Sequence, residues 1–315
     1  MTLVPQEQNR TGPKDHITVC ICTYKRPTFL NNLLDKLIYQ ETGDLFHYSI
    51  VIVDNDMEKS SEETVSSFHE KNPLQIDWYF EPERNISLAR NKSIKKAPGN
   101  YVALIDDDEF PSRSWLLNLY KTLKRYDADG VLGPVKPYFE YDPPEWIVKG
   151  KFCERPTYQT GTILQKDFRT GNVLLDIHIF DDEENYFDPK YGRSGGEDID
   201  FFERIIKKGH VIIWCDEAPV YEYVPVERHK RLFYVKRYMR IGGIRGKEAR
   251  ESRDLKGKTG LFLKFIAVFF VCFSILPVSL LFGHQFFMKF LIKSAHHFAW
   301  IASFLGYVFI RHKED

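Results

Sequence analysis

Four consecutive acidic side chains, Asp-Asp-Asp-Glu at residues 106–109, directly follow an apolar run that begins at Val102. An aliphatic run bounded by polar residues is typical of a buried strand in a parallel sheet, and α/β proteins present their ligands at the carboxyl ends of such strands. Adjacent carboxylates repel, so holding them together raises at least one pKa unless a cation compensates. Oxygen ligands alone favour Mg²⁺ or Mn²⁺ over zinc. The pattern indicates a divalent-metal site, with an acidic turn after a strand as the alternative.

Alternating strand and helix patterns precede this acidic motif. Apolar runs of strand length lie at residues 17–22, 48–53, 76–80 and 101–105, and helical spacing of apolar residues lies at 29–38 and 60–69. A further helix is expected after the loop that begins at Arg84. This order predicts an α/β fold with a mostly parallel sheet, in which polar residues collect at the carboxyl end of each strand.

The chain beyond the acidic motif carries weaker patterns. We expect a helix at 114–125, a strand at 130–135 and a last core strand at 211–215. Residues 137–156 are rich in proline and aromatic side chains and are expected to form an irregular wall over the site. A glycine pair at 195–196 opens a short helix that is expected to end at Gly209, because glycine commonly stops helices.

Two apolar stretches mark the C-terminal part of the chain. Residues 261–282 contain one charged side chain, Lys264, and at about 1.5 Å per residue a helix of this length spans a bilayer core. Residues 286–310 are nearly as apolar and predict either a second span or a helix that lies in the membrane interface. A two-helix hairpin is favoured, because it leaves both basic flanks in the cytosol, as the positive-inside rule requires.

Charge is unevenly distributed, although 44 basic residues balance 44 acidic ones. Between residues 228 and 258, twelve Lys and Arg stand against three acidic residues. Such a block meets phosphate groups. Because it adjoins an apolar stretch, we expect it to bind membrane lipids or a lipid-linked diphosphate, and we expect no nucleic-acid binding. A solvated helix that only satisfies the positive-inside rule is the alternative.

These patterns predict the domain organisation. Residues 1–15 are polar, lack a secretory signal and are expected to form a flexible tail. An α/β domain follows at 16–225, then a basic juxtamembrane segment at 226–260, the membrane hairpin at 261–310 and a cytosolic tail at 311–315. The five cysteines show no metal-binding spacing and are expected to be reduced, with Cys20 and Cys22 as core thiols on one face of a strand.

Five short motifs, considered together, resemble those of one enzyme family. They are Thr23-Tyr24-Lys25-Arg26-Pro27, Val53-Asp54-Asn55-Asp56, Ala89-Arg90-Asn91, Asp106-Asp107-Asp108 and Glu197-Asp198. Over residues 17–224 the chain resembles the inverting glycosyltransferases of family 2, which have the GT-A fold. The resemblance implies a Rossmann-like, mostly parallel sheet that binds a nucleotide-sugar donor, commonly a UDP-sugar, together with Mg²⁺ or Mn²⁺.

The resemblance also implies a role for each matching residue. Asp108 would bind the metal directly, and Asp106 would bind it through water or contact the ribose and sugar. Strand alternation would turn Asp107 to the opposite side from these two, where contact with solvent is as well supported as a binding role. The nucleotide would be held by Thr23, Tyr24, Arg26, Asp54 and Asn55, with Arg84 and Arg90 on the diphosphate. The alternatives are a turn or helix cap for Asp54 and a surface ion pair for Arg84.

The Glu197-Asp198 motif, at the start of a helix, would carry the acid–base chemistry. By resemblance, Asp198 is the general base that removes the proton of the acceptor hydroxyl, and Glu197 orients the base or the acceptor. Acidic residues that merely complement the helix dipole are the alternative.

The predicted function is therefore that of a bacterial exopolysaccharide glycosyltransferase, similar to those of succinoglycan assembly. It would sit at the inner membrane with its catalytic domain in the cytosol and add a sugar to a polyprenyl-diphosphate-linked glycan. One alternative transfers the sugar to polyprenyl phosphate itself. The non-enzyme alternative is a degenerate site that binds a sugar nucleotide and recruits a partner.

Overall fold

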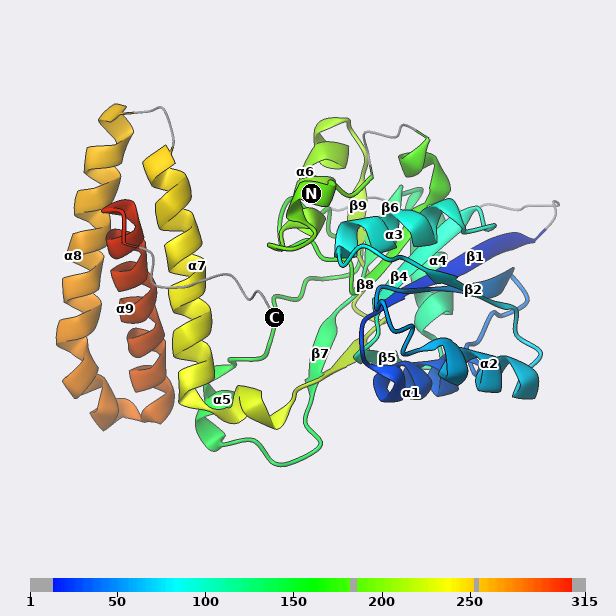
Figure 1. Cartoon of the computed structure of the whole chain (residues 1–315), viewed down its shortest axis with the longest axis horizontal. Coiled ribbons are helices and arrows are strands. Elements are labelled where there is room, and N and C mark those ends of the chain that lie inside the picture. The colour runs from blue at the N-terminus through cyan, green and yellow to red at the C-terminus, as the bar shows by residue number, and fades with distance from the viewer. Residues whose placement is uncertain (1–13, 182–185, 252–254, 308–315) are drawn as a thin grey trace. The chain divides into compact units, whose positions relative to one another are not determined.

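A computed structural model describes residues 14–181, 186–251 and 255–307. The chain divides into two compact units, shown in Figure 1. The first comprises Met1–Tyr138 and Glu154–Tyr223, and the second comprises Phe139–Cys153 and Val224–Asp315. We call them the α/β unit and the helical unit.

A seven-stranded sheet forms the centre of the α/β unit, with strand order β3-β2-β1-β4-β8-β6-β9. The strands are β1 Asp15–Thr23, β2 Phe46–Asp54, β3 Ile76–Phe80, β4 Tyr101–Asp106, β6 Gly130–Leu132, β8 Asn172–Asp176 and β9 Ile212–Trp214. The first four strands pair in parallel, and β6 pairs in parallel with β9. The predicted α/β fold with a mostly parallel sheet is confirmed.

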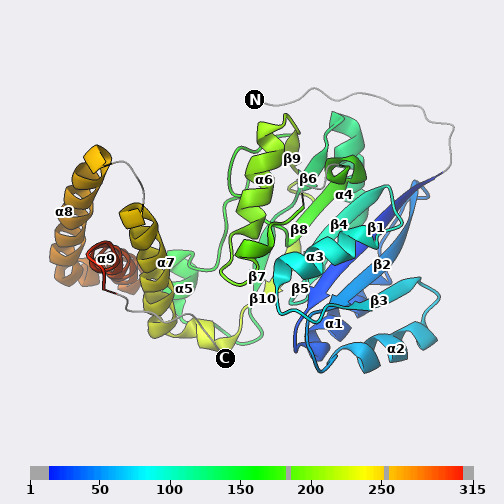
Figure 2. The same cartoon turned by 45° about the horizontal axis from the view of Figure 1, so that its top comes forward.

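Helices cover both faces of this sheet, so its strands are buried on both sides. One face packs against α1 Pro27–Leu37, α2 Glu62–Lys71 and α4 Trp115–Tyr126. The other packs against α3 Ile86–Lys95 and α6 Glu197–Lys207. Figure 2 shows α3 and α6 on the side of the sheet opposite α1 and α2. Cys20 and Cys22 both face the second of these cores, as their spacing predicted.

Strand β8 was not predicted, and it runs antiparallel to both β4 and β6. Its side chains from Val173 to Leu175 are fully buried in the middle of the sheet. At the start of the strand, Asn172 donates to the carbonyl oxygens of Pro134 and Ala218 and accepts from the indole of Trp115. The buried amide thus joins β8 to three other segments of the unit.

A second, three-stranded sheet has the order β5-β10-β7. Its strands are β5 Glu109–Pro111, β7 Val135–Tyr138 and β10 Val220–Tyr223. Strand β10 is antiparallel to β5 and parallel to β7. Because β5 begins directly after Asp108, this sheet continues from the acidic motif.

The expectation of an irregular wall at residues 137–156 is wrong. Residues Phe139–Cys153 belong to the helical unit and contain the short helix α5 Glu145–Gly150. Trp146 and Ile147 of this helix form a small core with Tyr234, Met288 and Ile292. The aromatic side chains of this stretch therefore serve the core of a second unit.

Three longer helices complete the helical unit: α7 Arg231–Glu251, α8 Leu255–Ser279 and α9 His284–Phe304. Among the described residues, one helix is long and apolar enough to cross a membrane, Lys258–Phe282. Only 11% of the most apolar 18-residue stretch of this helix is buried within the protein. The second predicted span continues past Tyr307, beyond the described part of the chain.

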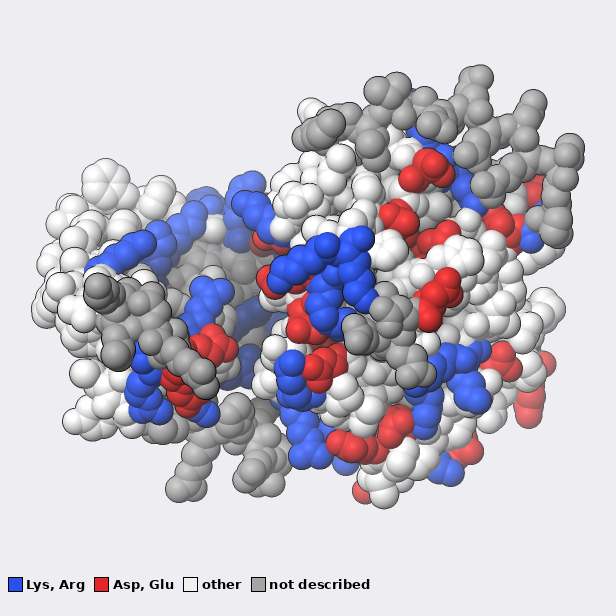
Figure 3. Space-filling view, turned by 90° about the horizontal axis from the view of Figure 1, so that it is seen from above, with Lys and Arg blue, Asp and Glu red and all other residues white. Residues whose placement is uncertain are grey.

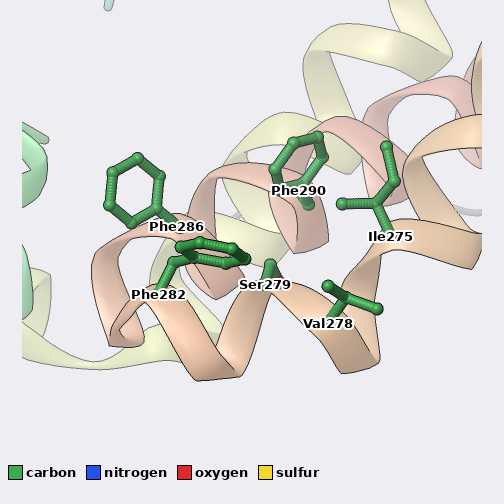
Figure 4. Close-up of a pocket in the computed structure, with 6 residues that line it drawn as sticks. All are labelled: Ile275, Val278, Ser279, Phe282, Phe286 and Phe290. Carbon is green, nitrogen blue, oxygen red and sulfur yellow. The ribbon is translucent and has the colours of Figure 1, made fainter.

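Charged and uncharged side chains lie apart on the face of the helical unit that Figure 3 shows. In Figure 3, Lys and Arg side chains run along this unit, whereas its left edge consists of uncharged side chains. Near the turn between α8 and α9, a hollow of about 220 Å³ is lined by Ile275, Val278, Ser279, Phe282, Phe286 and Phe290 (Figure 4). Ser279 donates its hydroxyl to the backbone of Leu276, so the lining is apolar in character.

Two glycines let α7 and α9 approach closely. A Cβ on Gly242 would lie 2.2 Å from the carbonyl oxygen of His296, and one on Gly246 would lie 2.3 Å from that of Trp300. Small residues four apart let helix backbones approach, as in many membrane helix pairs.

Replacing Gly246 with alanine is therefore expected to destabilise the helical unit by about 1–3 kcal/mol, the usual cost of overpacking. Gly243→Ala is the matched control, since a Cβ there meets no described atom within 4 Å. Thermal unfolding in detergent, followed by tryptophan fluorescence, measures the difference. Equal melting temperatures for the two variants would contradict the close packing.

Candidate active site

Three parallel strands bring polar side chains to one edge of the central sheet. Thr23 ends β1 and is the register partner of Asp54 at the end of β2, and Cys22 is the partner of Asp106 at the end of β4. Carboxyl ends of parallel strands share an edge, which is the usual ligand-binding edge of α/β sheets. The sequence-predicted nucleotide and metal residues therefore start from the same edge.

The aspartate motif forms the turn between β4 and β5. Asp107 accepts a hydrogen bond from the Thr23 hydroxyl at 2.8 Å and from Arg26 at 3.0 Å, and Arg26 also donates to Asp108 at 2.9 Å. Burial raises the pKa of Asp107, although Arg26 opposes the shift. Burial and the neighbouring charge of Asp106 raise the pKa of Asp108 to about 6. The turn therefore holds carboxylates that a cation would stabilise.

The strand alternation expected for the three aspartates does not apply. Strand β4 ends at Asp106, and Asp107 and Asp108 belong to the turn that follows. Because a turn has no period of two, both of these side chains reach Arg26. Asp107 is buried, so the solvent-facing alternative for this residue is wrong.

Arg90 links the aspartate motif to helix α6. Its guanidinium, on α3, donates to Asp106 at 3.3 Å and also to Glu197. Burial by itself lowers the pKa of Arg90, but Asp106 and Glu197 outweigh it and raise the pKa. The aspartate motif and the Glu197-Asp198 motif, about ninety residues apart in the sequence, are thus joined through the buried guanidinium of Arg90.

Asp198 lies in the first turn of α6, beside Glu197. The helix begins after Gly196, whose φ of 99° is accessible to glycine at little cost. Burial, and secondly the charge of Glu197, raises the pKa of Asp198. One of its oxygens accepts from the backbone of Ile199, and the side chain is only partly buried. A carboxylate with a raised pKa and partial exposure is suited to proton transfer.

Asp54 and Asn55 are held by the loops around them. Asp54 is fully buried and accepts hydrogen bonds from the backbone of Asp56 and from the backbone and hydroxyl of Ser61. Asn55 donates to the carbonyls of Glu81 and Glu83. These are the contacts that the turn alternative for Asp54 requires. The two residues therefore shape the loop after β2.

Tyr24 and Arg84 form a stacked pair. The guanidinium carbon of Arg84 lies 4.8 Å from the centre of the Tyr24 ring. Stacking of this kind holds an arginine in place while its N–H groups stay available to an anion. The partner of Arg84 is thus the Tyr24 ring. The alternative for Arg84, a surface ion pair, would instead require a carboxylate.

Sequence reasoning assigned no role to Asp56, which completes the Asp-Asn-Asp motif after β2. Its side chain is 2% exposed, and its Oδ2 has no hydrogen-bond partner among the described residues. Lys25 lies 3.8 Å from the other oxygen. A buried acceptor left without a donor is costly unless a ligand supplies one. The repeated acid in the motif was the signal that could have identified it.

Glu109, the fourth acid of the motif, also lacked a predicted role. It is 2% exposed and accepts a hydrogen bond from the backbone N–H of Asp106. Burial raises its pKa strongly, and the charge of Asp106 adds to the shift. Arg155 opposes this shift while it pairs with Glu222 on β10. The buried Glu109 side chain therefore stabilises the turn through its bond to the backbone of Asp106.

The donor set suits a hard divalent ion that is shared with a ligand. No group of three His, Cys, Asp or Glu side chains among the described residues could hold a metal ion. Asp106 and Asp108 supply oxygen atoms only, and Mg²⁺ is usually bound through one or two carboxylates plus substrate phosphates. The raised pKa of Asp108 is the expected sign of a carboxylate site that a cation would relieve.

Comparison with known proteins agrees with this geometry. The family model described as glycosyl transferase family 2 matches residues 18–182. The chain is 34% identical over 236 residues to the succinoglycan biosynthesis protein ExoM of Rhizobium meliloti, a match that covers 74% of each chain.

Two solved structures share the fold. A mannosyltransferase from Pyrobaculum calidifontis, in complex with GDP-Man and Mn²⁺, has a TM-score of 0.63 at 17% identity, covering 93% of this chain and 88% of that one. TarS 1-349 of S. aureus, in complex with UDP, has a TM-score of 0.52 at 16% identity, covering 94% and 93%. These likenesses show the GT-A fold.

Proposed function

Because the chain belongs to glycosyltransferase family 2, we propose that it is a metal-dependent, inverting enzyme that transfers one sugar from a UDP-sugar to a lipid-linked oligosaccharide. The observation that carries the proposal is Arg90, which bonds both Asp106 of the aspartate motif and Glu197 beside Asp198. A donor held at the first motif and an acceptor held at the second would meet there.

The residues of the site fit the donor. Asp106 and Asp108 would hold Mg²⁺ or Mn²⁺, which when bound stabilises the negative charge that develops on the leaving diphosphate. Arg26 and Arg90 lie beside these carboxylates and are suited to the diphosphate oxygens. Thr23 and Tyr24 would border the nucleoside, and Arg84, stacked on Tyr24, would offer its N–H groups to the diphosphate. Asp54 and Asn55 hold the loop after β2.

The proton is moved by this chain's own carboxylate. Asp198 accepts the proton of the acceptor hydroxyl as the oxygen bonds to the anomeric carbon and the bond to the diphosphate breaks. Attack from the face opposite the diphosphate inverts the anomeric centre. Glu197, fixed by Arg90, would hold Asp198 and the acceptor in line.

The helical unit fits a membrane-bound acceptor. The apolar helix Lys258–Phe282 would enter the inner membrane, and the basic residues of α7 would meet anionic headgroups on the cytosolic side. The succinoglycan biosynthesis protein that the chain resembles supports a role in exopolysaccharide assembly. The acceptor glycan would be carried on a polyprenyl diphosphate.

Purified protein in detergent, mixed with extracted lipid-linked oligosaccharides and a panel of nucleotide sugars, tests the proposal by mass spectrometry. We expect transfer from one UDP-sugar only when Mn²⁺ or Mg²⁺ is present. A protein that binds no nucleotide sugar in calorimetry would contradict it.

Asp56→Asn is expected to weaken UDP binding about tenfold, because a charged acceptor gives a stronger hydrogen bond than a neutral one. The free Oδ2 would accept the imide N–H of uracil. Glu58→Gln, at an exposed acid of the same loop, is the control. Calorimetric titration with UDP and Mn²⁺ measures both. Unchanged affinity in Asp56→Asn would exclude this contact.

A further inference from the structure

One face of the three-stranded sheet carries aromatic side chains from all three strands. In the strand register, Tyr221 lies opposite Phe110 and Tyr223 lies opposite Tyr138. Because side chains on a strand alternate between faces, these four rings share one face of the sheet. Phe29 of α1 joins them, with its ring centre 5.3 Å from that of Tyr223. We call these five residues the aromatic face.

The rings of the aromatic face support one another. The centre of the Phe110 ring lies 5.1 Å from Tyr138, 5.5 Å from Tyr221 and 5.1 Å from Tyr223. Tilted and offset arrangements at these distances are favourable for aromatic pairs. The face is therefore built as a unit and does not depend on a ligand for its form.

This face is not part of the protein core. Tyr138 is 41% exposed, and the other four rings are partly exposed. The opposite face of the same sheet carries Glu109 and Glu222. Clustered aromatic side chains that remain in contact with water mark binding surfaces more often than chance placement does.

The aromatic face begins at the proposed metal site. Phe110 is two residues beyond Asp108, a reach of about 7 Å along a strand. The backbone N–H of Tyr223 donates to the carbonyl of Asp108 at 2.9 Å. Whatever lies on these rings therefore lies next to the place where the sugar bond would break.

We propose that the aromatic face binds sugar rings of the acceptor glycan by stacking, an inference that rests on the proposed function. A pyranose presents C–H groups on its faces and hydroxyls around its rim. The rings match its C–H faces, while the hydroxyls of Tyr138 and Tyr221 match its rim. Lys136, register partner of Tyr221, adds a donor for sugar oxygens. A hydrocarbon chain would leave these polar groups unmatched.

Kinetics of the full-length protein in detergent test this assignment. Tyr138→Ala and Tyr221→Ala should each raise the KM for lipid-linked acceptor about tenfold, the loss expected for one stacked ring, with kcat unchanged. Tyr221→Phe, which keeps the ring, should stay within about threefold of the natural chain. Tyr39→Ala, at a tyrosine elsewhere in the α/β unit that is 59% exposed, is the control.

Two further measurements separate the possible failures. Calorimetric binding of UDP with Mn²⁺ should be unchanged in all four variants, and loss of it in the alanine variants would overturn the proposal by showing a role in the fold. The same glycan on a full-length and on a short prenyl diphosphate should give the same increase in KM. An increase seen only with the long chain would show that the rings bind lipid. If Tyr138→Ala and Tyr221→Ala both keep the KM of the natural chain, the aromatic face does not bind the acceptor. The proposed function would still stand.

Discussion

Replacing Asp108 with alanine is expected to lower sugar transfer by about a thousandfold and to abolish the effect of Mn²⁺ on donor binding. The variant removes the carboxylate whose pKa burial raises to about 6, and with it the oxygens that would hold the metal. Arg26 keeps Asp107 as a partner, so the turn should survive. Calorimetric titration with a UDP-sugar, with and without Mn²⁺, separates loss of metal from loss of fold.

Asp35→Ala is the matched control for this variant, since Asp35 is an exposed carboxylate on α1. It should leave transfer and metal dependence unchanged. Full activity of Asp108→Ala would reject the aspartate motif as the metal site, and the acidic turn would then be the correct reading of residues 106–109.

Asp198→Asn is expected to reduce kcat by about a thousandfold while donor binding stays intact. The amide oxygen can still accept the hydrogen bond from Ile199, so the start of α6 should keep its form. Asp200→Asn, two residues further along the same helix, is the control. The Asp200 carboxylate pairs with Arg204 of the same helix, so we expect it to take no part in proton transfer. Full transfer by Asp198→Asn would place the base elsewhere.

The pH profile provides a second check on Asp198. A base must be ionised to accept a proton, so transfer should fall as the pH drops through its pKa. Because burial and Glu197 raise that pKa, the fall should begin at a higher pH than for an ordinary aspartate. Measurements of kcat/KM against pH should show this limb in the natural chain and in Asp200→Asn alike. A limb at the ordinary aspartate value would contradict the buried setting.

Local patterns were sufficient to predict the first half of the α/β unit. Strands β1 to β4 are short apolar runs that end in polar residues. Strands β1, β2 and β3 pair in sequence order, and β4 pairs with the other side of β1. Strand β8 was missed because it lies between β4 and β6, far from both in sequence, and pairs with neither in parallel. Its apolar run at 173–175 is too short to be distinguished from a loop.

In the site, too, residues with local sequence signals were predicted, and those that depend on long-range packing were not. The aspartate motif and the start of α6 were identified from residue types, but Arg90 as the link between them depends on how α3 and α6 pack on the sheet. Asp56 was overlooked because a row of three polar residues does not show which one remains without a partner. Such distinctions arise from burial, which depends on contacts distant in sequence.

Residues 139–153 matter for anyone who wishes to express the α/β unit by itself. A stop codon after Tyr223 would remove α7 and α9 but leave α5, whose Trp146 and Ile147 are buried against Tyr234, Met288 and Ile292. Those two side chains would then face water, so the shortened protein is expected to aggregate. A deletion that also replaces residues 139–153 with a short glycine-serine linker should give a monomer in size-exclusion chromatography. Expressing the α/β unit alone therefore requires removal of two segments, because both Phe139–Cys153 and Val224–Asp315 belong to the helical unit.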